Sequence, residues 1–361
     1  MLPSPGQYAA QVIIHGRVSG MAIGHELRLH RASLCAVWLA ADTEVPRGRG
    51  VSFYILAAEP MAGYVAALAS PTLERRAGKP MNYRHAFHAG NFADVFKHTI
   101  LIGLIESLKS KQKPFNYMDT HSGRGHYLLD DTEAVRTAEA ADGVKRLLAS
   151  TRLPALVHVY LNLLRSLNSG REDLVEYPGS PLIASLLMRN EDRGVLCELQ
   201  PDECLALKAA MRGDARFSIH ERDGYEAMSA LLPPKERRGL VLIDPPFEAQ
   251  DGEFRIIEKA LAQAEKRWAS GIYAVWYPIK LRQQVQPFHR WLSKSGFDKV
   301  LVAELLLHPD NSALRLNGCG MAIINPPWKF ERQLEELLPA LQGLLSQGRF
   351  GQHRIEWLIR D

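Results

Sequence analysis

The residues with the clearest chemical potential in this sequence are Asp244-Pro245-Pro246-Phe247. They follow four aliphatic residues, 240–243, which predict a buried strand. Proline has no N–H for a sheet ladder and holds the residue before it out of helical geometry, so the strand must end here. Open α/β sheets place their ligand crevices at the carboxyl ends of strands. The motif therefore predicts a carboxylate, with an aromatic ring close by, at such a crevice.

A carboxylate beside an aromatic ring suits chemistry on the exocyclic amine of a flat base. The lone pair of that amine is delocalised into the base, which makes the amine a poor nucleophile. The Asp244 carboxylate and the Pro245 carbonyl are both acceptors, so together they can hold the two N–H bonds and take up the released proton. Positioning of this kind supplies roughly 7 to 11 kcal/mol of a barrier. Stacking of the base on Phe247 adds roughly 1 to 3 kcal/mol.

The tetrapeptide by itself does not identify a catalytic site. Asp-Pro-Pro-Phe can be a simple strand exit into a turn. The sequence also contains a second tetrapeptide of the same kind, Asn325-Pro326-Pro327-Trp328, after the predicted strand 321–324. The residues around each motif must decide between them.

A series of acidic strand ends favours Asp244. Four successive predicted strands, 115–118, 195–198, 217–220 and 240–243, end at or near the acidic residues Asp119, Glu198, Asp223 and Asp244. A carboxylate such as Glu198 can accept both hydroxyl hydrogen bonds of a ribose, and Asp223 can accept one from an adenine amine. Asn325 comes only after two further strands, 271–276 and 299–306.

The strands alternate with predicted helices, which gives a three-layer α/β sandwich. The helices are expected at residues 92–110, 182–189, 202–212, 253–269, 281–295 and 330–347, and residues 321–325 are expected to form the last strand of the sheet. Residues 119–125 contain a Gly-x-Gly turn that lets the backbone approach a ligand, but they match the dinucleotide fingerprint poorly, which argues against NAD. The late position of Glu198 indicates an inserted helical subdomain at about 130–190.

The helix at 92–110 begins after Asn91, a good N-cap, and repeats apolar residues every four positions, which predicts an amphipathic helix. Three histidines, His85, His88 and His98, lie in or just before it. No carboxylate or cysteine follows them at ligand spacing, so no metal site is predicted.

Composition restricts the class of protein. The chain has 361 residues, 46% of them hydrophobic, and a formal charge of +4 from 44 Lys and Arg against 40 Asp and Glu. Nucleic acid binding would therefore depend on a local basic face rather than on bulk charge. The four cysteines form no CxxC pair, which is typical of reduced thiols in a cytoplasmic protein, and no apolar run reaches membrane-spanning length.

Residues 1–80 show weak periodicity and no signal peptide. Strong patterning begins just after Met81. The first 80 residues are therefore expected to be a disordered N-terminal extension or translation from an upstream start, with a genuine accessory segment as the alternative.

With these residues placed, the sequence from Met81 onward resembles the bacterial family of 23S ribosomal RNA adenine-N6 methyltransferases that modify adenine 2030. The motifs that carry the resemblance are Tyr83-Arg84-His85 with His88-Ala89-Gly90-Asn91, Asp119-Thr120-His121, Tyr177-Pro178-Gly179-Ser180-Pro181, Asp223-Gly224, Leu242-Ile243-Asp244-Pro245-Pro246 and Asn325-Pro326-Pro327-Trp328. Residues 1–80 match nothing in the family.

The resemblance implies a monomeric enzyme that depends on S-adenosylmethionine and has a Rossmann-like class I methyltransferase fold. Its helical insertion would help to grip RNA. By residue-to-residue carry-over, Asp244 would hold and deprotonate the target amine, and Tyr83 would contact the substrate. The cofactor would be bound by His98, His121, Ser180, Glu198, Asp223 and Gly224, with Lys97 close by. The family pattern allows Tyr at the position of Phe247, and Phe keeps the stacking surface without the phenolic hydrogen bond.

The implied substrate is 23S ribosomal RNA, protein-free or in an early assembly intermediate, with no membrane involved. Two alternatives remain. An adenine-N6 methyltransferase that acts on DNA uses the same chemistry, and a nucleic-acid-binding protein without catalysis would keep the fold but lack cofactor affinity. The intact series of acidic strand ends argues against the second alternative.

Overall fold

The computed structural model describes residues 89–129, 143–150, 152–247, 250–311, 315–346 and 350–360, together with three strands near the N-terminus. The chain divides into two compact units, Met1–Pro80 and Met81–Asp361. In the first unit, β1 (Ala10–Val18), β2 (Met21–Leu29) and β3 (Tyr54–Ile55) form an antiparallel sheet in the order β2-β1-β3. These strands were not predicted from the sequence. Tyr83, His85 and His88 lie outside the described residues.

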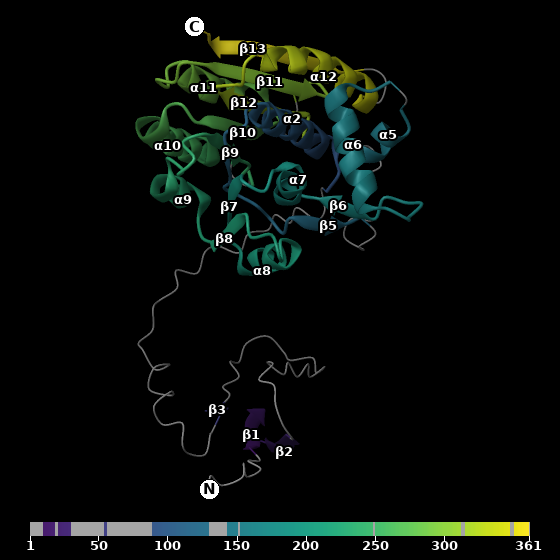
Figure 1. The fold of residues 1–361 in the computed structure, drawn as a ribbon, viewed down its shortest axis with the longest axis vertical. Helices are drawn as coiled ribbons and strands as arrows, with labels where there is room; N and C mark the ends of the chain where they lie inside the picture. Colours follow the sequence, from purple (N-terminus) through teal and green to yellow (C-terminus); the bar gives the residue numbers. More distant parts are fainter. Residues whose placement is uncertain are drawn as a thin grey trace. The chain divides into compact units, whose positions relative to one another are not determined.

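The second unit is built on an eight-stranded sheet, in the order β13-β11-β12-β10-β9-β4-β7-β8. The strands are β4 (Asn116–Asp119), β7 (Arg193–Glu198), β8 (Phe217–Glu221), β9 (Gly239–Ile243), β10 (Ile272–Ile279), β11 (Val300–Leu306), β12 (Gly318–Ile324) and β13 (Gln352–Ile359). Neighbours from β8 through β7, β4 and β9 to β10 are parallel, and β12 runs antiparallel to both β10 and β11. Figure 1 shows β13 and β8 at opposite edges of this sheet.

The strand order reverses between β4 and β9. The chain runs from β4 outward to β7 and β8, then returns to the other side of β4 as β9. A ligand crevice is expected at the carboxyl ends of the two strands that flank such a reversal. Asp119, the last residue of β4, pairs with Leu242 of β9, two positions before Asp244. The fold therefore brings Asp119 and Asp244, the first and last members of the acidic series, together at the carboxyl ends of two neighbouring strands.

Helices cover both faces of the sheet and bury two hydrophobic clusters. One face carries α2 (Phe92–Lys109), α5 (Val144–Leu148), α6 (Ala155–Leu167), α7 (Ser180–Leu187), α8 (Pro201–Ala210) and α12 (Phe330–Leu345). The other carries α9 (Gly224–Leu231), α10 (Gln250–Trp268) and α11 (Arg282–Leu292). This confirms the predicted three-layer α/β sandwich. Among the described residues, no helix combines the length and apolar character needed to cross a membrane.

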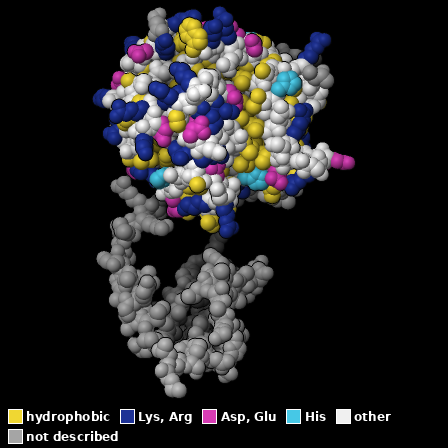
Figure 2. Space-filling view, viewed as in Figure 1, with side chains coloured by type: hydrophobic (Ala, Val, Ile, Leu, Met, Phe, Trp, Pro, Cys, Tyr) yellow, Lys and Arg dark blue, Asp and Glu magenta, His cyan; other side chains and the backbone are white. Residues whose placement is uncertain are grey.

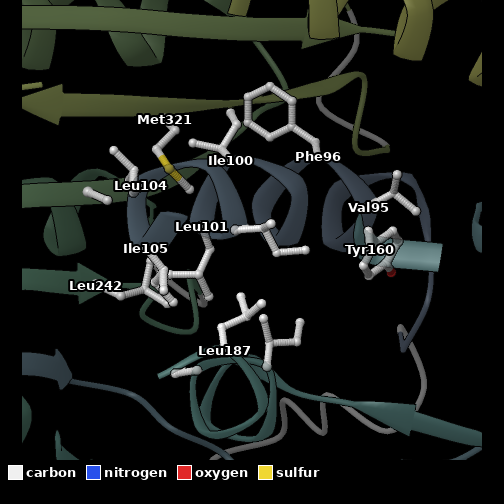
Figure 3. Packing of buried hydrophobic residues seen from close by; sticks show 14 of the residues in the cluster. Val95, Phe96, Ile100, Leu101, Leu104, Ile105, Tyr160, Leu187, Leu242 and Met321 are labelled. Carbon is white, nitrogen blue, oxygen red and sulfur yellow. The ribbon is translucent and has the colours of Figure 1, made fainter. Parts of the chain in front are cut away.

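Helix α2 lies at the centre of the first layer and is buried on nearly every side, so the prediction of an amphipathic helix was wrong. It packs against α6, α7 and α12 as well as the sheet. Figure 3 shows Ile100 and Leu104 on the side facing Met321 of β12, while Leu101 and Ile105 point towards Leu187 of α7. A helix that is apolar all round belongs in a core. This burial fixes the polar residues of its first turns against the crevice.

The segment predicted as a helical insertion contains strand as well as helix. β5 (His126–Leu128) pairs antiparallel with β6 (Glu176–Pro178), and α5 and α6 lie between them in sequence. Helix α7 packs on α2 and β4, so it is part of the main body. Residues 130–142 and 151 lie outside the described part of the insertion.

The prediction that residues 321–325 form the last strand was also wrong, because β13 follows and pairs antiparallel with β11. β13 is an edge strand with exposed charged residues, which protects an open edge from pairing with other chains. The apolar alternation that normally identifies a strand is correspondingly weak in it.

Candidate active site

A cavity of about 590 Å³ opens at the carboxyl ends of β4, β7 and β9. This volume lies within the usual range for small-molecule and cofactor sites. Every described residue that was predicted for the site lines it. They are Lys97, His98, His121, Ser180, Glu198, Asp223, Gly224, Asp244, Pro245 and Phe247. The structure thus brings together, around one cavity, residues that are far apart in the sequence.

Asp244 follows the last residue of β9 and forms an ion pair with Lys97 of α2. The Lys97 Nζ atom lies 2.6 Å from Asp244 Oδ2 and 3.0 Å from Asp94 Oδ1. The side chain of Lys97 is 6% exposed, that of Asp94 3% and that of Asp244 16%. One ammonium group therefore bridges two largely desolvated carboxylates and offsets part of their mutual repulsion.

Lys97 was expected near the cofactor, and its charged end lies on the predicted catalytic carboxylate. Asp94 was not predicted from the sequence as a functional residue. It was visible only as an acidic residue three positions before Lys97, a spacing that places two side chains on one face of a helix. Asp94 Oδ2 also accepts a hydrogen bond from the Gly90 N–H at 3.0 Å, which joins the lysine to the helix start.

The Phe247 ring closes one side of the cavity. It packs edge-on against Phe254 of α10, with ring centroids 5.4 Å apart, and against Trp276 of β10, at 5.9 Å. The Lys97 ammonium lies 5.9 Å from the centre of the Trp276 ring. Rigid aromatic neighbours hold the Phe247 ring in place beside Asp244, as a stacking surface for a base requires.

Glu198, the last residue of β7, holds the Gly-rich turn after β4. Its Oε2 accepts a hydrogen bond from the Gly123 N–H at 2.8 Å, and its Oε1 accepts one from the Gln200 N–H at 2.7 Å. Gly123 has a φ of 58°, which a residue with a side chain adopts only with strain. Burial raises the pKa of Glu198. Each carboxylate oxygen keeps further acceptor capacity for a ribose diol.

Asp223 caps the first turn of α9. Its Oδ1 accepts hydrogen bonds from the N–H groups of Tyr225 at 2.7 Å and Glu226 at 3.1 Å. The next residue, Gly224, approaches β4 so closely that a Cβ there would lie 2.0 Å from the Thr120 carbonyl oxygen. Only glycine fits this contact, which brings the capped helix end to the edge of the cavity.

His121 lies between the β4 turn and α9. Its Nδ1 is 2.8 Å from Thr120 Oγ1, and its ring meets the Tyr225 ring edge-on with centroids 5.0 Å apart. Burial lowers the pKa of His121 to about 4. The ring is therefore neutral at physiological pH and acts through hydrogen bonding and packing.

This burial predicts an acid sensitivity. The fold favours neutral His121, so the stability it contributes is complete above the unfolded pKa of 6.5 and is lost as the pH falls through about 4. His121→Phe keeps a ring against Tyr225 but cannot take up a proton. Between pH 7 and pH 4, the free energy of unfolding should fall less in the variant than in the wild type, by up to about 3 kcal/mol. Urea unfolding without ligand at both pH values measures this difference. Equal losses in the two proteins would contradict it.

Asp119 and Ser180 form a support behind the cavity wall. Asp119 is fully buried, and its Oδ2 accepts hydrogen bonds from Ser180 Oγ and Tyr117 Oη, both at 2.7 Å. Burial raises the pKa of Asp119 to about 6, although these hydrogen bonds oppose the shift. Asp119 therefore positions Ser180 and the start of the Gly-rich turn, while Ser180 itself lines the cavity.

His98 is held from behind by two buried tyrosines. Its Nδ1 lies 3.0 Å from Tyr177 Oη, which in turn lies 2.8 Å from Tyr160 Oη. From the sequence, Tyr177 was placed only within a turn motif, and Tyr160 was not identified. Tyr225 and Glu253 were missed as well, and they form a second hydrogen bond of 2.6 Å at the cavity wall. No local pattern links such pairs, since their members are on separate elements.

The second tetrapeptide, at Asn325, lies beside the amino end of β10, whereas the cavity opens at the carboxyl ends of the parallel strands. Because β12 is antiparallel to β10, the end of β12 lies beside the start of β10. Ile324, the residue before Asn325, pairs there with Tyr273. Asn325 Nδ2 donates hydrogen bonds to the carbonyl oxygens of Ala269 at 2.6 Å and Gly271 at 2.8 Å. Asn325-Pro326-Pro327-Trp328 is therefore a strand exit, as the series of acidic strand ends indicated.

Among the described residues, no group of three or more His, Cys, Asp or Glu side chains is arranged to hold a metal ion. Cys197, Cys204 and Cys319 are buried free thiols. The described lining of the cavity includes carboxylates, the buried Lys97 and aromatic rings.

Comparison with known proteins gives a consistent result. A family model described as "Ribosomal RNA large subunit methyltransferase D, RlmJ" matches residues 112–359. Two curated proteins named Ribosomal RNA large subunit methyltransferase J, from Haemophilus influenzae and Escherichia coli K12, are each 42% identical to this chain over 281 residues, 78% of this chain and 100% of the relative.

A crystal structure of a Legionella pneumophila protein is similar in both sequence and fold. It is 36% identical to this chain, with a TM-score of 0.69, and the match covers 74% of this chain and 98% of that one. The family resemblance carried by the sequence motifs is thereby confirmed. This chain belongs to the RlmJ family of ribosomal RNA large subunit methyltransferases.

Proposed function

We propose that this protein transfers a methyl group from S-adenosylmethionine to the N6 amine of adenine 2030 in 23S ribosomal RNA. The observation that carries the proposal is the position of Asp244, Pro245 and Phe247 in the same cavity as Glu198 and Asp223. The first three suit a base amine, and the last two suit a nucleoside. Family membership supports ribosomal RNA as the substrate class.

The cavity fits the cofactor in size and in donor chemistry. Glu198 would accept the ribose hydroxyl hydrogen bonds, and Asp223 would accept from the adenine amine through the oxygen that does not cap α9. Gly123 and Gly224 line the cavity with backbone atoms. At Gly224 a side chain is also excluded, because its Cβ would collide with the Thr120 carbonyl oxygen. His98, His121 and Ser180 would complete the site. When bound, the cofactor supplies an electrophilic methyl group on a sulfonium ion.

Asp244 acts on the target base. With Lys97 bonded to its Oδ2, the carboxylate is fixed in orientation, and its other oxygen can accept one N6–H bond while the Pro245 carbonyl accepts the second. The lone pair of the amine is then directed out of the base plane. Asp244 takes up the proton released on methylation. Phe247 holds the face of the base, which must leave its stack to reach the cavity.

Apart from the target base, the RNA would be recognised outside this cavity. Lys and Arg side chains are spread over the visible face of the second unit (Figure 2), which suits contact with a phosphate backbone. We assign the inserted segment with α5 and α6 to RNA contact, and Tyr83 to contact with the substrate. The protein acts as a cytoplasmic monomer on protein-free RNA or an early assembly intermediate.

Labelled methyl transfer to protein-free 23S RNA and to duplex DNA tests this function. The expected result is transfer to RNA only, both by the full chain and by a shortened chain that begins at Met81, because residues 81–361 form a compact unit that contains every described residue lining the cavity. Transfer to DNA instead would favour a DNA adenine-N6 methyltransferase. Transfer to neither, together with no binding of S-adenosylmethionine, would favour a binding protein without catalysis. Loss of transfer in the shortened chain alone would assign a role to residues 1–80.

A further inference from the structure

We propose that Tyr177 and Tyr160 fix the proton of His98 on Nε2, so that the ring acts as a hydrogen-bond donor to the carboxylate of the cofactor's amino acid end. This inference rests on the proposed function. His98 comes from α2, lines the cavity and is almost fully buried. Tyr177 comes from β6 and Tyr160 from α6, and neither is exposed to solvent. Three elements therefore meet in one hydrogen-bonded chain behind the cavity wall.

The hydrogen bonds that join Tyr160, Tyr177 and His98 allow only one arrangement of protons in which both hydroxyl protons have an acceptor. It contains two hydroxyl protons and two short contacts, Tyr160 Oη to Tyr177 Oη at 2.8 Å and Tyr177 Oη to His98 Nδ1 at 3.0 Å. Within the described part of the chain, the Tyr160 hydroxyl has no hydrogen-bond partner except Tyr177. Tyr160 must therefore donate to Tyr177, and Tyr177 must donate to His98. Nδ1 is then an acceptor, and the ring proton is on Nε2.

The reverse arrangement leaves a buried proton without an acceptor. If Nδ1 carried a proton, in the other neutral tautomer or in the imidazolium ion, Tyr177 would accept from it and donate to Tyr160. The proton of the fully buried Tyr160 hydroxyl would then have no hydrogen-bond acceptor within the described part of the chain, and an unsatisfied buried donor is costly. Burial also raises the pKa of both tyrosines, so each keeps its proton at physiological pH.

An N–H donor complements the rest of the cavity. Glu198, Asp223 and Asp244 are acceptors, and they suit the hydroxyl and amine groups of two nucleosides. The cofactor also has a carboxylate, which needs donors. A neutral His98 with its proton on Nε2 supplies one without placing a second cation beside Lys97. Tyr177 and Tyr160 are positioning residues, because they act through His98.

Long-range ¹H–¹⁵N NMR of the histidine-labelled full chain measures the tautomer directly, with His98→Gln used to assign the resonance. The expected spectrum of the wild type is that of a neutral ring protonated on Nε2. Tyr177→Phe removes the donor to Nδ1, so the His98 signals should shift towards a mixture of tautomers. Tyr273→Phe is the matched control, since it removes a buried hydroxyl bonded to the Trp268 carbonyl oxygen in the other core cluster. A wild-type ring protonated on Nδ1 would overturn the proposal.

Calorimetry with two ligands identifies the group that His98 contacts. Tyr177→Phe should weaken binding of S-adenosylmethionine about twofold to threefold, because the dissociation constant rises in inverse proportion to the fraction of His98 rings that carry the proton on Nε2. The affinity for decarboxylated S-adenosylmethionine should be the same in this variant and in the wild type, because this ligand lacks the acceptor. Tyr273→Phe should change neither affinity. Equal weakening for both ligands would exclude the carboxylate as the partner of His98.

The proposed function and the role of the two tyrosines fail in different ways. If the wild type binds no S-adenosylmethionine, the proposed function is wrong and the assignment of His98 fails with it. If the wild type binds the cofactor and methylates RNA while Tyr177→Phe keeps full affinity and an unchanged His98 spectrum, only the role of the two tyrosines is wrong.

Discussion

Replacing Asp244 with Ala should reduce methyl transfer to 23S RNA by at least about 10³-fold, at the upper end of the loss seen when a preorganised polar group is removed from an active site. The variant lacks both the acceptor for the N6–H bond and the group that takes up the proton. S-adenosylmethionine affinity should change by less than about threefold, because the residues assigned to the cofactor stay in place. Single-turnover transfer and calorimetry measure the two quantities separately.

Glu198→Ala provides the matched contrast. This change removes the acceptor proposed for the ribose and releases the N–H groups of Gly123 and Gln200. Cofactor affinity should fall by about 10-fold to 100-fold, as expected for the loss of hydrogen bonds to a charged group. At saturating cofactor, transfer should recover far more than in Asp244→Ala. A loss of cofactor affinity in Asp244→Ala as large as that in Glu198→Ala would refute this division of roles.

Lys97→Met should lower methyl transfer by about 10²-fold and also destabilise the protein by about 3 to 5 kcal/mol, because a buried ion pair would lose one partner. Methionine keeps the length and apolar stem of lysine but removes the ammonium group that pairs with both Asp94 and Asp244. Asp244 then loses the bond that fixes its orientation. Transfer rates at saturating cofactor and urea unfolding give the two effects.

A second substitution separates stability from catalysis. Adding Asp94→Asn to Lys97→Met removes one of the two carboxylate charges that Lys97 had bound, so stability should partly return while transfer stays low. Lys109→Met is the control on the same helix, since its ion pair with Glu106 is far more exposed and contributes little. If the double variant regained transfer along with stability, Lys97 would have only a structural role.

Most of the sheet could be predicted because its strands end abruptly. Proline after Asp244, glycine after Asp223 and the turn after Asp119 each stop a short apolar run, and the structure confirms β4, β7, β8 and β9 within a few residues. β13 could not be predicted, because it is a polar edge strand and its partner β11 ends 46 positions before it begins. β5 and β6 are too short to show a period, since each has three residues.

The residues around the cavity were predicted individually, but their contacts were not. Asp244 and Lys97 are 147 positions apart, and nothing local in either segment indicates that they meet. The same is true of Tyr160 and Tyr177 behind His98, which come from different elements of the insertion. Sequence patterns identify strand ends and helix caps, whereas pairs of buried polar groups depend on how the layers pack.

We expect Asp244 to direct methyl transfer to the N6 amine of an adenine. The most direct test digests 23S RNA to nucleosides after incubation with labelled S-adenosylmethionine and either the wild type or Asp244→Ala. We expect label in N6-methyladenosine with the wild type and none with the variant. Label in any other nucleoside, or undiminished N6-methyladenosine with Asp244→Ala, would contradict this role of Asp244.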